Sequence, residues 1–133
     1  MLTGTTYRPP HHEKVEQMID EAMNMVVIEK NPILKASKIH FYIAQIAPFV
    51  YGNGKVARLM GNLILRHYGY PPFSLQVAMK NEYLNSLDKF HSLDESNHFN
   101  EWLIKTYYHQ SLRVFENIIN ISQKEKQFFN KEK

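Results

Sequence analysis

The chain lacks cysteine entirely, and its 133 residues include only 5 glycines. Without cysteine it cannot form disulfides, thiolate metal sites or a cysteine nucleophile, which fits a reducing compartment but does not require one. No stretch approaches the roughly 20 apolar residues of a membrane span. The first residues also lack the apolar run of a signal peptide. We therefore expect a protein that does not span a membrane.

The chain also lacks a large excess of basic or acidic residues, since the formal net charge is only +3. Lysines gather in the last ten residues, 124–133, while the other basic residues are scattered along the chain. This distribution favours a solvated, frayed tail over a dedicated surface for nucleic acid. Apolar residues make up 44% of the chain, which is enough for the core of one compact domain.

Apolar residues at helical spacing, separated by proline and glycine breakers, predict an all-α fold. One helix follows Pro9-Pro10 and ends before Asn31-Pro32, and the last begins at Ser96 or Asn97. That last segment reads as one long helix or as two with a kink near Gln110. The helices expected between them cover residues 32–46, 55–68 and 80–90.

Three parts of unequal size are expected along the chain. Residues 1–10 form an N-terminal flap or linker remnant, residues 11–123 the helical domain, and residues 124–133 the charged tail. The segment from Thr3 to Arg8 has strand or loop character, with no partner strand after it. We expect the chain to begin inside a larger protein.

The segment 51–58, Tyr-Gly-Asn-Gly-Lys-Val-Ala-Arg, is the most informative part of the sequence. Gly52 and Gly54 allow a tight turn that exposes backbone N–H groups at the start of the following helix. Such a concave set of donors binds phosphate, and Lys55 and Arg58 add positive charge on one face of the first turn. A simple connector between two helices is the alternative interpretation.

A longer stretch around this turn resembles the signature of the Fic family, His-Pro-Phe-x-Asp/Glu-Gly-Asn-Gly-Arg-x-x-Arg. Residues 47–58 read Ala-Pro-Phe-Val-Tyr-Gly-Asn-Gly-Lys-Val-Ala-Arg. The preceding helix contains His40 to Ile46, and the following helix ends in Gly69-Tyr70-Pro71-Pro72, as in the family. The resemblance implies a Fic-like helical bundle with the active loop between its two central helices.

The resemblance also assigns roles to positions in the loop. Position 47 would hold the general base, position 51 a carboxylate for Mg²⁺, and Phe49 would plug into the core to fix the loop. The anion nest would be Gly52, Asn53 and Gly54. Position 55 would contact phosphate and Arg58 would bind the outer phosphates.

Two residues in the helix after the motif are weaker candidates for an adenine wall. These are Tyr83 and Leu87, for which a plain core role is the alternative. His40 lies seven residues before position 47, and a structural hydrogen bond is favoured over a catalytic role there. His11, His12 and Glu13 are interpreted as a polar first turn rather than a metal site.

Three positions depart from the family pattern, and each has a chemical consequence. Ala47 cannot accept a proton, and the loss of a general base lowers a rate by about 10²–10⁴-fold. Tyr51 offers a neutral phenol where a hard cation needs a carboxylate. Lys55 keeps the charge of arginine without its planar fork. We expect this chain to transfer AMP negligibly.

The origin of Ala47 stays open between a natural and an engineered substitution. Tyr for Asp and Lys for Arg are each one base change away, whereas Ala for His needs more than one. Alanine is also the usual replacement for disarming a histidine. We favour an engineered alanine in a naturally divergent motif.

The resemblance implies transfer of AMP from ATP, with Mg²⁺, to a Ser, Thr or Tyr hydroxyl of a protein presented as an extended segment. One alternative is a Fic pseudoenzyme that binds nucleotide or a partner without chemistry. Another is a relative with a different donor of UMP, phosphate or phosphocholine, and a third is a plain helical interaction module. A cytoplasmic location, or secretion into a host cell as an effector, is expected.

Fic proteins are often restrained by a helix with the motif Ser/Thr-x-x-x-Glu-Gly/Asn. The segments 92–95 and 122–125 have serine and glutamate at the wrong offset for it. We therefore expect any restraint of this kind to come from an inhibitory partner or from a missing N-terminal segment.

Overall fold

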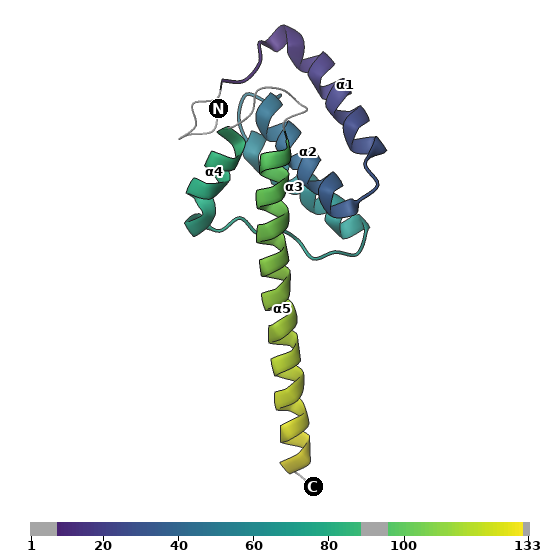
Figure 1. The fold of residues 1–133 in the computed structure, drawn as a ribbon, viewed down its shortest axis with the longest axis vertical. Helices are drawn as coiled ribbons and strands as arrows, with labels where there is room; N and C mark the ends of the chain where they lie inside the picture. The colour runs from purple at the N-terminus through teal and green to yellow at the C-terminus, as the bar shows by residue number, and fades with distance from the viewer. Residues whose placement is uncertain (1–7, 89–95, 132–133) are drawn as a thin grey trace.

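The computed structural model describes residues 8–88 and 96–131, which form helices and connecting segments without a strand. The helices follow one another as α1 (His12–Ile28), α2 (Pro32–Ile46), α3 (Asn53–His67), α4 (Lys80–Asp88) and α5 (Asn97–Lys131), with a 3₁₀ turn at Val77–Met79 (Figure 1). The predicted all-α fold is confirmed for this part of the chain. The proposed flap strand falls on residues 3–8, of which only Arg8 is described, and Arg8 is not in a strand.

The ends of α2 and α3 follow the breakers in the sequence. The Asn31 side chain caps α2 by accepting hydrogen bonds from the N–H groups of Ile33 and Leu34, at 3.0 and 3.1 Å. Pro32 occupies the first turn of α2, where its missing N–H is not needed. Gly69 adopts a left-handed φ of 80° directly after α3, as predicted for a C-terminal glycine.

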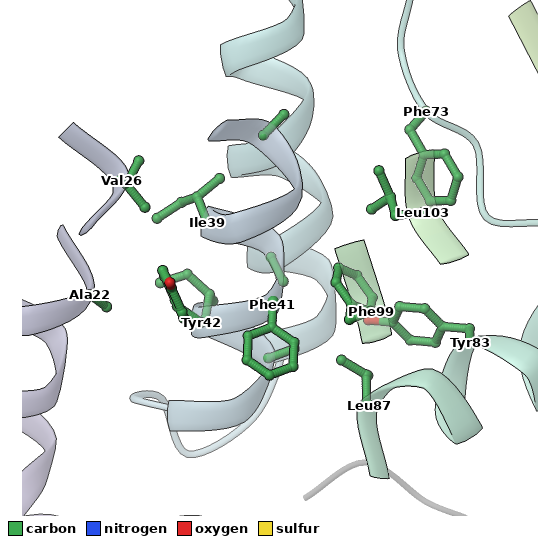
Figure 2. Close-up of a cluster of buried hydrophobic side chains, with 14 of the residues drawn as sticks. Ala22, Val26, Ile39, Phe41, Tyr42, Phe73, Tyr83, Leu87, Phe99 and Leu103 are labelled. Atoms are coloured by element: carbon green, nitrogen blue, oxygen red, sulfur yellow. The ribbon is translucent and has the colours of Figure 1, made fainter. Parts of the chain in front are cut away.

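Helix α2 is the centre of the molecule, because α1, α3 and α5 all pack against it. Its residues from Ala36 to Ile46 are buried except for Lys38. Figure 2 shows side chains of α1, α4 and α5 converging on the aromatic and aliphatic side chains of α2. An aromatic group around Phe99 links α2, α4 and α5, with ring centroids 5.2 to 6.1 Å from those of His40, Phe41, Tyr83 and Trp102.

Helix α5 corrects two expectations for the C-terminal part. It is a single helix through Gln110, so the alternative of two helices with a kink is wrong. The charged segment expected to fray is helical to Lys131, although it is exposed as predicted. Only the first turns of α5 bury side chains, and the remainder runs away from the other helices (Figure 1).

Candidate nucleotide-binding site

The loop between α2 and α3 is shaped by two left-handed residues. Ala47 ends α2 with φ 48° and ψ 58°, and its N–H still donates to the carbonyl of Ile43 at 3.0 Å. Gly52 precedes α3 with φ 82°, a conformation that glycine adopts without strain. Residues other than glycine rarely adopt a left-handed backbone conformation. The contacts around Ala47 must therefore stabilise this conformation.

Asn53 holds the loop closed from the first position of α3. Its side-chain oxygen accepts from the N–H of Phe49 at 2.9 Å, and its side-chain nitrogen donates to the carbonyl of Phe49 at the same distance. The sequence assigned Asn53 to the anion nest, and this clamp was not foreseen. The expectation that Phe49 plugs into the core is wrong, because Phe49 is 51% exposed.

The first turn of α3 presents its amides to a cavity beside the loop. The N–H of Val56 is used by the carbonyl of Gly52 at 3.0 Å. Helix geometry provides no intrahelical acceptor for the N–H groups of Asn53, Gly54 and Lys55, which lie at the positive end of the helix dipole. The cavity has a volume of about 350 Å³, and its lining includes Ala47, Tyr51, Gly52, Asn53, Gly54, Lys55 and Arg58. The predicted loop residues therefore share one cavity.

Arg58 joins this first cavity to a second one. The second cavity has a volume of about 310 Å³ and is lined by Arg58, Leu75, Gln76, Val77, Lys80, Tyr83 and Leu84. Tyr83 is buried but still borders this space. Leu87 lines neither cavity and is 1% exposed within the core, which is the plain core role given as the alternative for it.

Beneath Arg58 lies a neutral polar pair. The ring nitrogen Nε2 of His40 is 2.9 Å from the hydroxyl of Tyr83, and both residues are buried. Burial, with a smaller effect of the Arg58 charge, lowers the pKa of His40 to about 3. Burial raises the pKa of Tyr83 to about 12, although Arg58 opposes that shift. His40 therefore has the structural hydrogen bond that the sequence favoured.

The lining of the first cavity does not suit a protein-bound Mg²⁺. Among the described residues that line it there is no carboxylate, and the phenol of Tyr51 is 86% exposed. The Asn53 side-chain oxygen is already engaged by Phe49. Because Mg²⁺ prefers carboxylate and phosphate oxygens, these residues would not hold it by themselves.

One other group of possible metal ligands occurs in the described part of the chain. The ligand atoms of His11, His12 and Glu13 lie within 4.8 Å of one another at the start of α1, and all three residues are exposed. His11 Nδ1 is 3.8 Å from a Glu13 carboxylate oxygen. The polar first turn stays a prediction, because three exposed groups at this spacing could also hold a metal ion.

The sequence profile of the Fic/DOC family matches residues 2–65, which include α1, α2, the loop and most of α3. Residues 2–65 of this chain belong to the Fic/DOC family. Among the described residues, no helix combines the length and apolarity that crossing a membrane requires.

Curated relatives of this chain carry adenylyltransferase names. It is 36% identical over 75 residues to "Protein adenylyltransferase fic-1" of Caenorhabditis briggsae, a match covering 56% of this chain and 15% of that protein. It is 33% identical over 86 residues to "Protein adenylyltransferase Fic" of Nematostella vectensis, covering 61% and 20%. The matches thus span a fifth or less of these relatives' own lengths.

Proposed function

We propose that this Fic chain binds the polyphosphate of a nucleoside triphosphate at the α2–α3 loop, within the framework of a protein adenylyltransferase. The observation that carries the proposal is the cavity in which unpaired first-turn amides of α3 meet Lys55 and Arg58. Unpaired backbone N–H groups at a helix N-terminus, together with the positive charges of Lys55 and Arg58, can bind the negatively charged oxygens of a triphosphate. The adenylyltransferase names of the relatives support ATP as the donor.

The second cavity suits the nucleoside end of the same ligand. Arg58 borders both cavities, so a nucleotide with its phosphates on α3 can extend past Arg58 toward Tyr83. Leu75, Val77 and Leu84 supply apolar walls for a base there. Tyr83 thus keeps its proposed role beside the base, while Leu87 supports that region from the core.

We infer that transfer to the hydroxyl of a protein substrate is negligible in this chain. Ala47 stands at the cavity wall, where the family places its histidine, and a methyl group cannot take the proton of an attacking hydroxyl. A carboxylate that could recruit Mg²⁺ is missing from the described lining, so charge neutralisation depends on Lys55 and Arg58. These two features favour a nucleotide-binding pseudoenzyme as the second candidate.

Calorimetric titration with ATP tests the binding step. The Arg58→Ala variant should bind ATP at least about tenfold more weakly, because it loses a charge-assisted hydrogen bond of about 1.5–3 kcal/mol. Arg66→Ala is a matched control, since Arg66 is an exposed cation in the last turn of the same helix. Equal ATP affinity in Arg58→Ala and the unmodified chain would contradict the proposed site. Titrations with UTP and CDP-choline distinguish ATP from other donors.

Labelling with ATP that carries a tagged α-phosphate tests the chemical step. The Ala47→His variant puts an imidazole at the cavity wall, and histidine tolerates the left-handed backbone of this position better than most residues. Labelling of protein substrates by Ala47→His but not by the unmodified chain supports a disarmed transferase. Binding of ATP without labelling by either chain supports the pseudoenzyme.

A further inference from the structure

The distal half of α5 exposes an apolar face that no described part of the chain covers. Six large side chains between residues 114 and 129 are each 50% to 64% exposed: Val114, Phe115, Ile118, Ile121, Phe128 and Phe129. Figure 1 shows this part of α5 running away from the other helices. A helix that is not packed against its own domain is marginal in water, so its stability depends on covering this face.

The exposed residues follow a seven-residue spacing. One row contains Tyr107, Val114, Ile121 and Phe128, and a second row contains Tyr108, Phe115, Ser122 and Phe129. Tyr107 is buried against the domain, so the first row continues the core-facing side of α5 outward. A seven-residue repeat of apolar positions is the pattern by which one α-helix packs along another.

The opposite face of the distal segment is polar and carries charges of both signs, while Glu125, seven residues after Ile118, lies on the same side of the helix as Ile118. Arg113, Glu116 and Lys124 are exposed on the polar face, together with Asn117 and Asn120. Residues 113–131 of α5 carry four basic side chains, Arg113, Lys124, Lys126 and Lys131, and two acidic ones, Glu116 and Glu125, so charge does not decide between an anionic membrane surface and a protein helix. The seven-residue spacing of the apolar rows favours a protein helix as their occupant.

The exposed area has the size that a stable dimer needs. Six side chains of this kind at roughly half exposure present on the order of 700 Å² per helix. A specific interface buries about 800 Å² per partner. Tyr108 and Leu112, which are also exposed, extend the same face toward the domain. Two copies of α5 can thus supply one another with a sufficient apolar surface.

We propose that two copies of this chain form a two-fold dimer in which the distal halves of α5 pack antiparallel. With Ile118 on the two-fold axis, Phe115 faces Ile121 of the partner subunit and Tyr108 faces Phe128 of the partner subunit. The overlap then runs from about residue 105 to residue 131, about 40 Å of helix. The two helical domains lie at opposite ends of this overlap.

Sedimentation velocity over a range of protein concentrations tests the dimer with the full chain. We expect a monomer–dimer equilibrium in which Ile118→Glu weakens association at least about tenfold, because it buries a carboxylate at the centre of the interface. Asn120→Glu adds the same charge on the polar face and should leave association unchanged. Circular dichroism of each variant verifies that the helical domain remains folded. A chain that stays monomeric at several hundred micromolar overturns the proposal.

Disulfide trapping tests the antiparallel arrangement. Because the chain has no native cysteine, only the introduced cysteines can form disulfides. Ser111→Cys and Glu125→Cys chains are mixed under mild oxidation. Antiparallel pairing places position 111 opposite position 125, so heterodisulfides should predominate over homodisulfides. Homodisulfides of each variant alone would indicate a parallel pair, and absence of any crosslink would indicate that α5 is not at the interface. Either outcome overturns the proposal.

Discussion

Asn53 connects the loop to the helix that presents the amides. Both of its side-chain hydrogen bonds go to the backbone of Phe49, at 2.9 Å each. Asn53→Ala should lower the free energy of unfolding by about 1–2 kcal/mol, because Phe49 loses two partners in a part-buried place. It should also weaken ATP binding, because the loop is no longer fixed against the first turn of α3. Chemical denaturation and calorimetry measure the two effects.

Asn62 offers a matched control for that variant. It makes the same two-bond clamp from α3, with the backbone of Phe73 at 2.8 and 3.1 Å. Asn62→Ala should reduce stability by a similar amount while leaving ATP affinity within about twofold, because Asn62 lines neither cavity of the proposed site. Equal losses of ATP affinity in both variants would contradict a specific role of Asn53 in the loop.

His40 makes stability depend on pH in a defined direction. Its pKa is about 3 in the folded chain and about 6.5 when unfolded. Between these values the unfolded chain binds more protons, so stability rises with pH and is lost as pH falls from about 6.5 toward 3. The contribution of this residue amounts to about 1.4 kcal/mol per pH unit in that window.

Denaturation of the unmodified chain and of His40→Gln between pH 4 and pH 8 isolates this contribution. As pH falls, the unfolding free energy of the unmodified chain should decrease relative to that of His40→Gln, because glutamine does not titrate. The facing groups are Arg58 and Tyr83, and the Tyr83 pKa of about 12 lies outside the window. A pH-independent difference would show that His40 is not held neutral by burial.

For single residues, the sequence predicted which residues line the cavity better than it predicted how their side chains are placed. The residues of the cavity from Ala47 to Arg58 could be named because the resemblance to the Fic signature assigns their positions, whereas spacing alone indicated only a possible phosphate site at the start of α3. The exposed ring of Phe49 and the clamp by Asn53 could not, because side-chain placement in a short loop depends on which backbone groups remain unpaired. Tyr83 shares its hydrogen bond with His40 across 43 residues, a contact that no local pattern encodes.

Among the elements, α2 and α3 approach closely at Gly61. A Cβ atom built on Gly61 would lie 3.2 Å from the carbonyl oxygen of Ala36 and 3.6 Å from the Cβ of His40. Gly61→Leu should therefore lower the unfolding free energy by about 1–3 kcal/mol, through overpacking. Helix propensity alone would raise it by about 0.8 kcal/mol. Thermal denaturation gives the sign directly.

Arg66→Leu introduces the same side chain at an exposed position of α3 and should change stability by at most about 0.5 kcal/mol. A Gly61→Leu chain as stable as this control would mean that α2 and α3 do not touch at Gly61.

The sequence predicted helix boundaries well where strong helix-breaking or capping residues occur. Asn31-Pro32 and Gly69 mark their helix ends because cap hydrogen bonds and backbone angles are local properties. The sequence left the continuity of α5 through Gln110 open, although glutamine is a good helix former. The Gln110 side chain bonds Ser74, with Oε1 accepting from the backbone N–H at 3.2 Å and Nε2 donating to the carbonyl. These hydrogen bonds link residues 36 apart in the sequence, and they form at the position where a kink was expected.

For the whole molecule, the contrast between the packed domain and the distal part of α5 predicts uneven local stability. Hydrogen exchange should be slow at amides of residues 99–107, which bury side chains, and faster beyond residue 111 in dilute solution. Raising the protein concentration should slow exchange only in the distal part, because dimerisation covers it. Mass spectrometry of peptic peptides gives both rates. Exchange that is uniformly slow and independent of concentration would contradict a distal helix stabilised by pairing.

The central claim of the account is that the first turn of α3 receives the phosphates of a nucleotide. Nitrogen–proton correlation spectra recorded during an ATP titration test it most directly, because each amide reports separately. We predict that the largest shifts occur at the amides of Gly54 and Lys55, and that Arg58→Ala reduces them at equal ATP concentration. Spectra in which these amides stay unchanged while ATP shifts residues elsewhere would contradict the claim.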